Sequence, residues 1–501
     1  MNNSPNWHLL IIVLLFASNH VRSQNQIDTT SNSNFTSIAV GALVADSIPS
    51  FWQKINTYGT VPTERLFSFL DVQIKRHYIS KKNKNFHFYL SGHARGLAFN
   101  NPQVLLPEAS FSSNYRNLSL TIGRHKEVIG LGDTLMSSGF YSVSSNALPI
   151  PKIKLASNGF IPLKFTKGLL AINFSLGHGW FGKQDFAQNY FLHQKTFFLR
   201  FTTPSKKFSL AAGVSHLVQW GGRAPLLIGT NRTGPNGELP NTIKDFWYVI
   251  TAKKFPNASN LSTFDSENRV GNHLGSIDFL ASFRAKFSVW QLYLQHPAEN
   301  LPGVFSNFPD GLYGISWKNT RKGNNKFSIS NIIVEHLTTL DQGLFFNPII
   351  NGYQGNGYFN NSQYMDGWTY KNHVIGTPFI LTRFDTRQEW FNVLGSYSNG
   401  DYWKINGNSV SMWHFGIQGK LTPNTKFSLK IARSNYFFDL QPSGIYLKSG
   451  YQYCTFLLID QELKVLKGIS INTSIGYDQG NILPTSLSNV TSIKWYINHS
   501  R

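Results

Sequence analysis

Apolar and polar residues alternate with a period of two over much of the chain. Large apolar side chains alternate with small or polar ones most clearly in residues 170–177, 208–215 and 469–478, and more weakly in 86–90, 413–417 and 427–431. Alternation of this kind predicts β-strands with one apolar and one polar face. A soluble β-sandwich and a transmembrane β-barrel both contain such strands, so the pattern alone leaves both open.

The connections between the predicted strands fall into two classes. Residues 203–206 (Thr-Pro-Ser-Lys) and 423–425 (Pro-Asn-Thr) predict tight hairpin turns. Longer connections rich in Gly and Asn span residues 221–244, 254–272, 296–311 and 341–388. Outer-membrane barrels have short periplasmic turns and long external loops, so this division favours the barrel.

Two further details favour the barrel over the sandwich. The polar faces of the predicted strands carry small or uncharged residues, as expected of a barrel lumen. Aromatic residues gather at strand ends, as in residues 436–438 and 495–496, and resemble the girdles at membrane interfaces. The sequence therefore predicts an all-β, closed antiparallel transmembrane barrel.

Residues 124–154 break the period-two pattern. The segment contains Gly130, Gly132 and Gly139, which allow backbone angles closed to other residues, and Pro149 and Pro151, which remove amide donors. Residues around the prolines therefore do not form an interior strand. The segment is either a plug or binding feature inside the barrel or an ordinary long connection, and the pattern leaves both open.

The first residues predict export. Residues 9–17 are an unbroken apolar run, too short for a membrane helix of about 20 residues, and 21–23 (Val-Arg-Ser) resemble a cleavage site. We expect residues 1–23 to be a signal peptide, with an uncleaved anchor as the alternative, and residues 24–501 to form one barrel domain. The single cysteine, Cys454, excludes an internal disulfide and is expected to serve packing rather than chemistry.

The chain is strongly basic, which indicates an acidic partner. It contains 46 Lys and Arg against 25 Asp and Glu, a net charge of +21. Export argues against nucleic acid, which leaves lipopolysaccharide phosphates in the outer membrane and acidic polysaccharide. The alternative is that these residues are solvated in loops and turns.

Several segments resemble the Wzi family of capsule assembly proteins, in particular its Bacteroidetes-type members. Residues 144–152 (SSNALPIPK) are similar to an "S-x-N-A-x-P-I-P" signature of that family. Further similar segments follow in family order, at residues 49–59, 219–222, 269–278, 335–337, 358–361, 367–370 and 375–379. The chain departs from the family at residues 293–299, where a Phe-Glu pair is expected.

This resemblance implies a specific architecture and role. It implies a monomeric barrel of about 18 strands in the Gram-negative outer membrane, with helices closing its periplasmic end. It also implies retention of capsular polysaccharide or exopolysaccharide at the cell surface. Residues 50–56 and the region around Pro149 are the candidates for a plug.

Carbohydrate binding also has support from the residues themselves. Aromatic faces cover the C–H side of a sugar ring while amides and charged groups bind its hydroxyls. One predicted loop supplies that mixture, and two other places supply less of it, so the candidate glycan-binding residues are Tyr353, Tyr358, Asn360, Asp366, Trp368, Trp220, Arg223 and Trp403. Each of these could instead belong to a girdle or pack a loop over the barrel mouth.

No catalytic or metal-binding motif accompanies these residues. The chain lacks H-E-x-x-H, G-x-S-x-G, a P-loop and Cys/His metal spacing, so we expect no cofactor, no metal and no catalysis. Four scattered carboxylates, Glu335, Asp341, Asp366 and Asp385, could meet in the lumen as a hydrolase would need. The sequence thus predicts a non-catalytic polysaccharide-binding barrel, with a porin or substrate-selective channel as the alternative.

Overall fold

The computed structural model describes residues 34–254, 262–299, 307–321, 327–342, 357–390, 404–440 and 446–498. The expected signal peptide, residues 1–23, lies outside this part of the chain. Among the described residues, no helix is long and apolar enough to cross a membrane.

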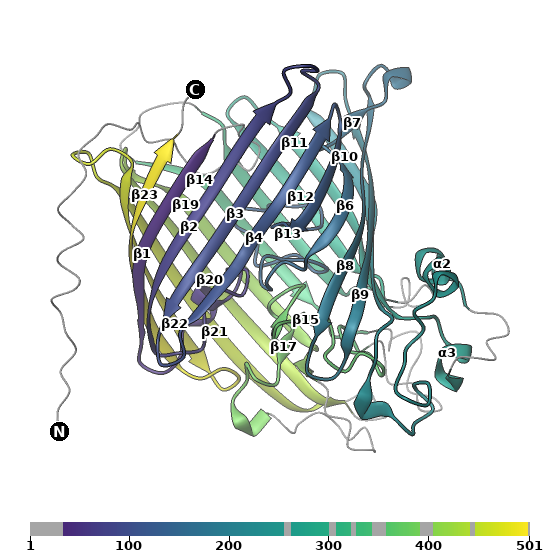
Figure 1. The fold of residues 1–501 in the computed structure, drawn as a ribbon. Coiled ribbons are helices and arrows are strands. Elements are labelled where there is room, and N and C mark those ends of the chain that lie inside the picture. Colours follow the sequence, from purple (N-terminus) through teal and green to yellow (C-terminus); the bar gives the residue numbers. More distant parts are fainter. Residues whose placement is uncertain are drawn as a thin grey trace, which may run out of the picture.

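The strands form one closed antiparallel ring (Figure 1). The first strand, β1 (Phe35–Ala45), pairs with β2 (Leu66–Ile79) on one side and with the last strand, β23 (Ser486–Asn498), on the other. Two short strands, β6 (Lys152–Ser157) and β7 (Ile161–Pro162), both pair with β8 (Leu170–Lys183) and make up one interrupted strand. The ring therefore has 18 strands, as expected.

The remaining strands follow one another around the ring in chain order. They are β3 (Phe86–Ala98), β4 (Gln103–Tyr115), β5 (Leu118–Arg124), β9 (Gln188–Thr202), β10 (Phe208–Trp220), β11 (Asn272–Arg284), β12 (Ser288–Pro297), β13 (Gly311–Asn319), β14 (Ser328–Thr338), β19 (Val410–Thr422), β20 (Thr425–Leu440), β21 (Tyr446–Glu462) and β22 (Ile469–Gly480).

The period-two pattern sorts side chains between the two faces of the ring. On β10, Leu210 and Val214 are exposed on the outer face, whereas Ser215 is buried on the inner face. The outer faces of most other strands likewise carry exposed large apolar side chains, such as Leu70, Phe197 and Ile493. This belt is what a lipid-facing surface requires, and all six predicted strand stretches lie within strands of the ring.

The predicted aromatic girdle is wrong for Tyr436 and Phe438. Tyr436 and Phe438 are buried inside the ring, where Phe438 stacks on Trp390 with ring centroids 4.7 Å apart. Both have the same parity along β20 as the buried Ala432, so they face the interior. Sequence position alone could not separate an interfacial aromatic residue from one that packs within the ring.

The two ends of the ring differ as the sequence predicts (Figure 1). One end carries short turns, including residues 203–207 and 423–424, together with the start of β1 and the end of β23. The other end, called the loop end below, carries the long connections at residues 46–65, 125–151, 221–271, 298–310 and 339–409. The described residues at the short-turn end include one short 3-10 helix, Lys164–Thr166, but no α-helix, and the three described α-helices all belong to loop-end connections.

Residues 125–151 lie inside the ring and form a plug rather than an ordinary connection. The backbone N–H of Leu131 donates to Asp278 on β11 at 2.8 Å, and that of Ser138 donates to Glu335 on β14 at 2.6 Å. The segment begins after β5, so it crosses the interior to reach these strands. Inward-facing carboxylates thus bind backbone amides that a crossing segment would otherwise leave unsatisfied.

A second connection also enters the ring. It contains α1 (Phe51–Lys54), whose first amide donates to Asp478 on β22 at 2.6 Å. The indole of Trp52 donates to the carbonyl oxygen of Cys454 at 3.2 Å, and Cys454 is buried and free, as predicted. Residues 50–56 and the Pro149 region therefore both belong to the interior packing, as the sequence suggested.

Candidate functional site

The segment at residues 357–377 closes the loop end over the plug. Its aromatic residues Tyr358 and Trp368 are fully buried. The indole of Trp368 donates to the carbonyl oxygen of Ser142 in the plug at 2.7 Å, and the hydroxyl of Tyr358 donates to Asp310 at 2.9 Å. Two of the predicted sugar-binding aromatics therefore join two layers of the closure.

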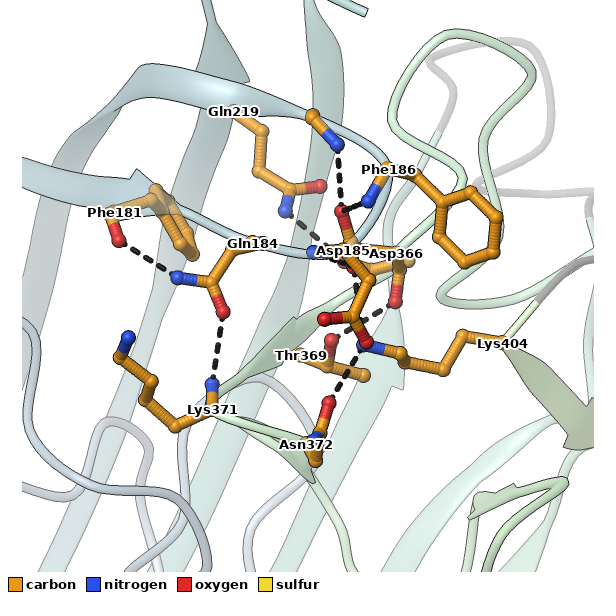
Figure 2. Close-up of polar contacts among 12 residues, drawn as sticks. Phe181, Gln184, Asp185, Phe186, Gln219, Asp366, Thr369, Lys371, Asn372 and Lys404 are labelled. Atoms are coloured by element: carbon orange, nitrogen blue, oxygen red, sulfur yellow. Dashed lines mark hydrogen bonds and ion pairs between the residues drawn. The ribbon is translucent and has the colours of Figure 1, made fainter. Parts of the chain in front are cut away.

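Asp366 is the polar centre of this closure (Figure 2). Its carboxylate accepts hydrogen bonds from three backbone amides of the turn between β8 and β9, at 3.2 Å from Asp185, 3.0 Å from Phe186 and 2.9 Å from Ala187. The ammonium group of Lys404 lies 3.0 Å from the same carboxylate. A fully buried carboxylate is tolerated because these donors replace the water it has lost.

Lys404 links three separate parts of the loop end (Figure 2). Its side chain is 1% exposed, and its ammonium group lies 2.7 Å from Asp185 and 2.8 Å from the amide oxygen of Asn372. Asp185 is 56% exposed, so the network runs from a buried ion pair out to the surface. Asp185 and Asn372 are not among the predicted site residues, and no local motif distinguishes them from ordinary turn residues.

The hairpin of β15 (Thr369–Tyr370) and β16 (His373–Val374) presents polar groups at this surface. Its two turn residues, Lys371 and Asn372, are exposed and have positive φ angles of 49° and 64°. The amide of Lys371 donates to the side chain of Gln184 at 3.1 Å, which fixes this turn against the turn between β8 and β9 (Figure 2).

The other predicted site residues lie in different environments. Trp220 is on the outer face of β10, 5% exposed and stacked on Phe246 with centroids 5.0 Å apart. Arg223 is exposed and donates to the carbonyl oxygen of Asn236 at 2.7 Å, and Asn360 is half-buried. The structure therefore brings Tyr358, Asn360, Asp366 and Trp368 together, whereas Trp220 lies apart from them on the outer wall. Arg223 lies beside the β8–β9 turn, because its backbone pairs with that of Gln188. Tyr353 and Trp403 lie outside the described residues.

Charged groups lie where the plug meets the inner face of the ring. Glu127 is ion-paired with Lys152 and, at 2.7 Å, with Lys154 on β6. Burial alone would raise the pKa of Glu127, but the two lysines lower it below its ordinary range. On the nearby strands β2 and β3, Asp71 binds Arg95 at 2.6 Å. The interior is therefore polar and charged beneath the apolar closure.

The cavities found at the closure are small. One is lined by residues that include Glu127, Lys152 and Trp368, the other by residues that include Phe51 and His373, and each encloses about 30 Å³. That volume holds a water molecule but not a sugar ring. Neither of these two cavities therefore accommodates a glycan.

Three of the four carboxylates that a hydrolase would need bind different partners. Glu335 accepts from the plug, Asp366 pairs with Lys404, and Asp385 pairs with Lys54 at 2.6 Å. Within the described part of the chain, no group of three or more His, Cys, Asp or Glu side chains is arranged to hold a metal ion.

Comparison with known proteins gives a relationship in fold only. No protein-family model matches the chain, and no curated protein matches it in sequence. The structure is similar to that of Wzi from Escherichia coli, described as an outer-membrane protein involved in group 1 capsule assembly and a carbohydrate-binding β-barrel. The identity is 13% and the TM-score 0.58, over 94% of this chain and 85% of that one.

Two Pseudomonas aeruginosa proteins are more distantly similar. OccK5 (OpdH) is 8% identical with a TM-score of 0.45, over 94% of this chain and 99% of that one. OpdQ is 7% identical with a TM-score of 0.46, over 94% of this chain and all (100%) of that one. The closed ring of 18 strands and its apolar outer belt identify the protein as a Gram-negative outer-membrane barrel with a Wzi-like fold.

Proposed function

We propose that this barrel binds capsular polysaccharide or exopolysaccharide at the loop end and retains it at the cell surface without catalysis. The observation that carries the proposal is the closure itself. Residues 46–65, 125–151 and 357–377 pack across the interior as a fixed, hydrogen-bonded layer. A barrel filled in this way offers a rigid platform at one end, which suits binding better than free diffusion.

The proposed binding surface combines exposed charges with the buried residues that support them. Lys371 and Asn372 project from the β15–β16 turn, Arg223 is exposed, and Asn360 is half-buried. Lysine and arginine would bind uronate carboxylates, and the asparagine amides would bind hydroxyl groups. Tyr358, Asp366 and Trp368 act from beneath by fixing the backbone of this surface.

The decisive experiment deletes the gene and measures cell-associated against shed polysaccharide. We expect polysaccharide to move from cells to medium, and complementation with the wild-type gene to restore it. Unchanged retention would contradict the proposal. A strain carrying Arg223→Ala and Lys371→Ala should shed more polysaccharide at unchanged barrel levels, whereas Phe384→Ala, at another exposed loop-end site, should not.

A substrate-selective channel is the alternative function, and one observation favours it. The plug reaches toward the short turns with a polar group, since Asp133 lies 3.2 Å from the ammonium group of Lys318 on β13 and accepts a hydrogen bond from Asn331 on β14 at 3.0 Å. Planar-bilayer recordings distinguish the two functions. A steady open conductance without glycan binding would favour the channel, whereas a closed barrel that binds polysaccharide in solution would favour retention.

We also propose that the protein is a monomer, which a mass measurement in detergent tests.

A further inference from the structure

The connection between β10 and β11 lies against the outer wall of the ring. Its helix α2 (Ile243–Thr251) places Phe246 on Trp220 of β10, and Val249 joins the same buried cluster. Trp220 has the same parity along β10 as Leu210 and Val214, which are exposed on the outer face. Helix α2 therefore covers wall rather than barrel mouth, and Figure 1 shows it beside the barrel.

Beneath α2, the wall carries polar side chains where lipid-facing residues would be expected. His178 and His193 lie 5.6 and 5.5 Å from the ring of Phe246, and the imidazole of His216 lies 2.9 Å from that of His273. Polar groups facing hydrocarbon are costly in a membrane barrel. Covering them with a helix removes that cost, which explains why an external connection returns to the wall at this place.

Both ends of α2 are fixed. At its start, Thr242 and Asp245 form a reciprocal capping box. Near its end, Lys195 of β9 donates a hydrogen bond from the wall to the carbonyl oxygen of Ile250. The helix therefore has a defined orientation, and the side chains opposite the wall have a defined direction.

The face of α2 that points away from the wall is apolar and exposed. Ile243 is 85% exposed and Trp247, one helical turn later, is 62% exposed. Nearby in the same connection, Leu226 and Ile228 are also exposed. Lys244 is exposed on the helix, and Lys253 and Lys254 are exposed just after it. Tryptophan beside lysine is typical of a membrane–water interface.

The height of the apolar belt indicates what covers this face. On β2, exposed outer residues run from Leu66 to Tyr78, which corresponds to about 30 Å of height for a tilted strand. On β10 they run only from Phe208 to Val214, which corresponds to about 15 Å, against the ~25 Å of a typical apolar band. The missing half of the belt on β10 lies at the loop end, where α2 covers the wall.

We propose that α2 completes the belt as a lipid-binding helix in the loop-end leaflet of the outer membrane. Ile243 and Trp247 enter the boundary between head groups and acyl chains, and the lysines bind lipid phosphates. Membrane lipid is thus the occupant of this face. The inference is independent of the polysaccharide role, because it rests on the outer wall rather than on the closure.

A spin label tests the depth of the helix directly. The variant Trp247→Cys is prepared in a Cys454→Ser background, labelled with a nitroxide, and reconstituted into phosphatidylcholine vesicles containing phosphatidic acid. We expect a high collision rate of the label with oxygen and a low collision rate with a water-soluble nickel chelate. Leu70→Cys, in the belt, provides the membrane reference, and Asn236→Cys, at an exposed loop site, provides the aqueous one.

The outcomes separate lipid from other occupants. The proposal would be overturned if a label at position 247 were as accessible to the nickel chelate as a label at position 236. It would also be overturned if the label at position 247 became protected from the chelate only after another protein was added. Replacing Lys244, Lys253 and Lys254 by Glu should make the label shallower in vesicles with phosphatidic acid but not in pure phosphatidylcholine. An unchanged depth in both would overturn the phosphate contact.

Discussion

At the scale of single residues, the structure of the loop end depends on charged side chains that are buried away from solvent. Lys404 compensates Asp366, and both side chains are almost completely buried. Removing one partner of a buried ion pair leaves the charge of the other partner buried and unpaired. The resulting loss of folding free energy is far larger than the net contribution of the intact pair. The exposed end of the same network, at Asp185, is screened by solvent and contributes little.

We therefore expect Lys404→Met to destabilise the folded protein by about 3–5 kcal/mol. The matched control, Asp185→Asn, should cost less than about 1 kcal/mol, because Asp185 is 56% exposed. Urea unfolding in lipid vesicles, followed by tryptophan fluorescence, measures both. Equal effects for the two variants would mean that the Asp366 carboxylate is not held by Lys404.

A second residue-scale prediction concerns pH. Burial raises the pKa of Glu299 to about 8 and that of Asp310 to about 6, although tyrosine and backbone donors oppose the shift. Both groups hold residues of the closure, since Glu299 accepts from Tyr141 and Phe359. An acid whose folded pKa is raised favours folding at pH values below its unfolded pKa, and this contribution is lost as the pH rises through the folded value.

The closure should therefore loosen as the pH rises from about 4 to about 8. The protection factor of the Phe359 amide against hydrogen exchange, measured across this pH range, reports this loosening. Glu299→Gln keeps an oxygen that accepts both hydrogen bonds and has no proton to lose. It should therefore flatten the pH dependence in its upper part, and a slope unchanged by this substitution would count against Glu299 as its source.

At the scale of elements, short segments rather than long helices close the barrel. Helix α1 has four residues, yet it packs Phe51 and Trp52 against Phe379, with Phe51 and Phe379 centroids 4.9 Å apart. A four-residue helix is unstable alone, so its shape is imposed by the surrounding ring. The same holds for the two-residue strands β15 and β16.

Trp52→Ala should release helix α1 from the wall and lower the free energy of unfolding by about 3–5 kcal/mol. The indole of Trp52 bonds to the backbone of Cys454, whose thiol is buried. We expect the thiol to react faster with a maleimide in the variant than in the wild type. Trp413→Ala removes an equally large side chain that is 58% exposed on the outer face, and it should leave thiol reactivity unchanged.

The elements also indicate how much of the molecule could be predicted from its sequence. The alternation in residues 208–215 predicted both the strand and its outward face, because the period of a strand is a local property. The role of residues 125–151 stayed open, since the carboxylates of Asp278 and Glu335 that bind it are nearly 150 and 200 residues away along the chain. Long-range pairing of this kind leaves no local pattern.

The sequence predicted which types of residue form the site, but not where each side chain lies in the fold. The mixture of aromatic and amide residues around residue 358 was recognisable, yet Trp368 proved to be buried and Trp220 to lie on the opposite face of the wall. The partnership of Lys404 with Asp366 and Asp185 joins the β8–β9 turn to two distant parts of the connection 339–409, and only the folded chain brings them together.

At the scale of the whole molecule, the ring closes through a tightly packed seam between β1 and β23. Gly41 of β1 faces inward at this seam, where an added Cβ would lie 2.6 Å from both Phe69 and Ser492. Gly41→Val should therefore disturb closure by about 1–3 kcal/mol, and Ala42→Val, which points outward, should not. The yield of the compact, heat-modifiable band on gel electrophoresis measures closure, and equal yields would contradict this role of Gly41.

The pairing of residue 35 with residue 498 has a consequence for biogenesis. A sheet with open edges cannot rest in hydrocarbon, because its unpaired amides and carbonyls would find no partner there. The first strand acquires its second neighbour only when the last one arrives. Almost the whole polypeptide must therefore have been exported, and kept from aggregating, before a stable membrane-embedded cylinder can exist.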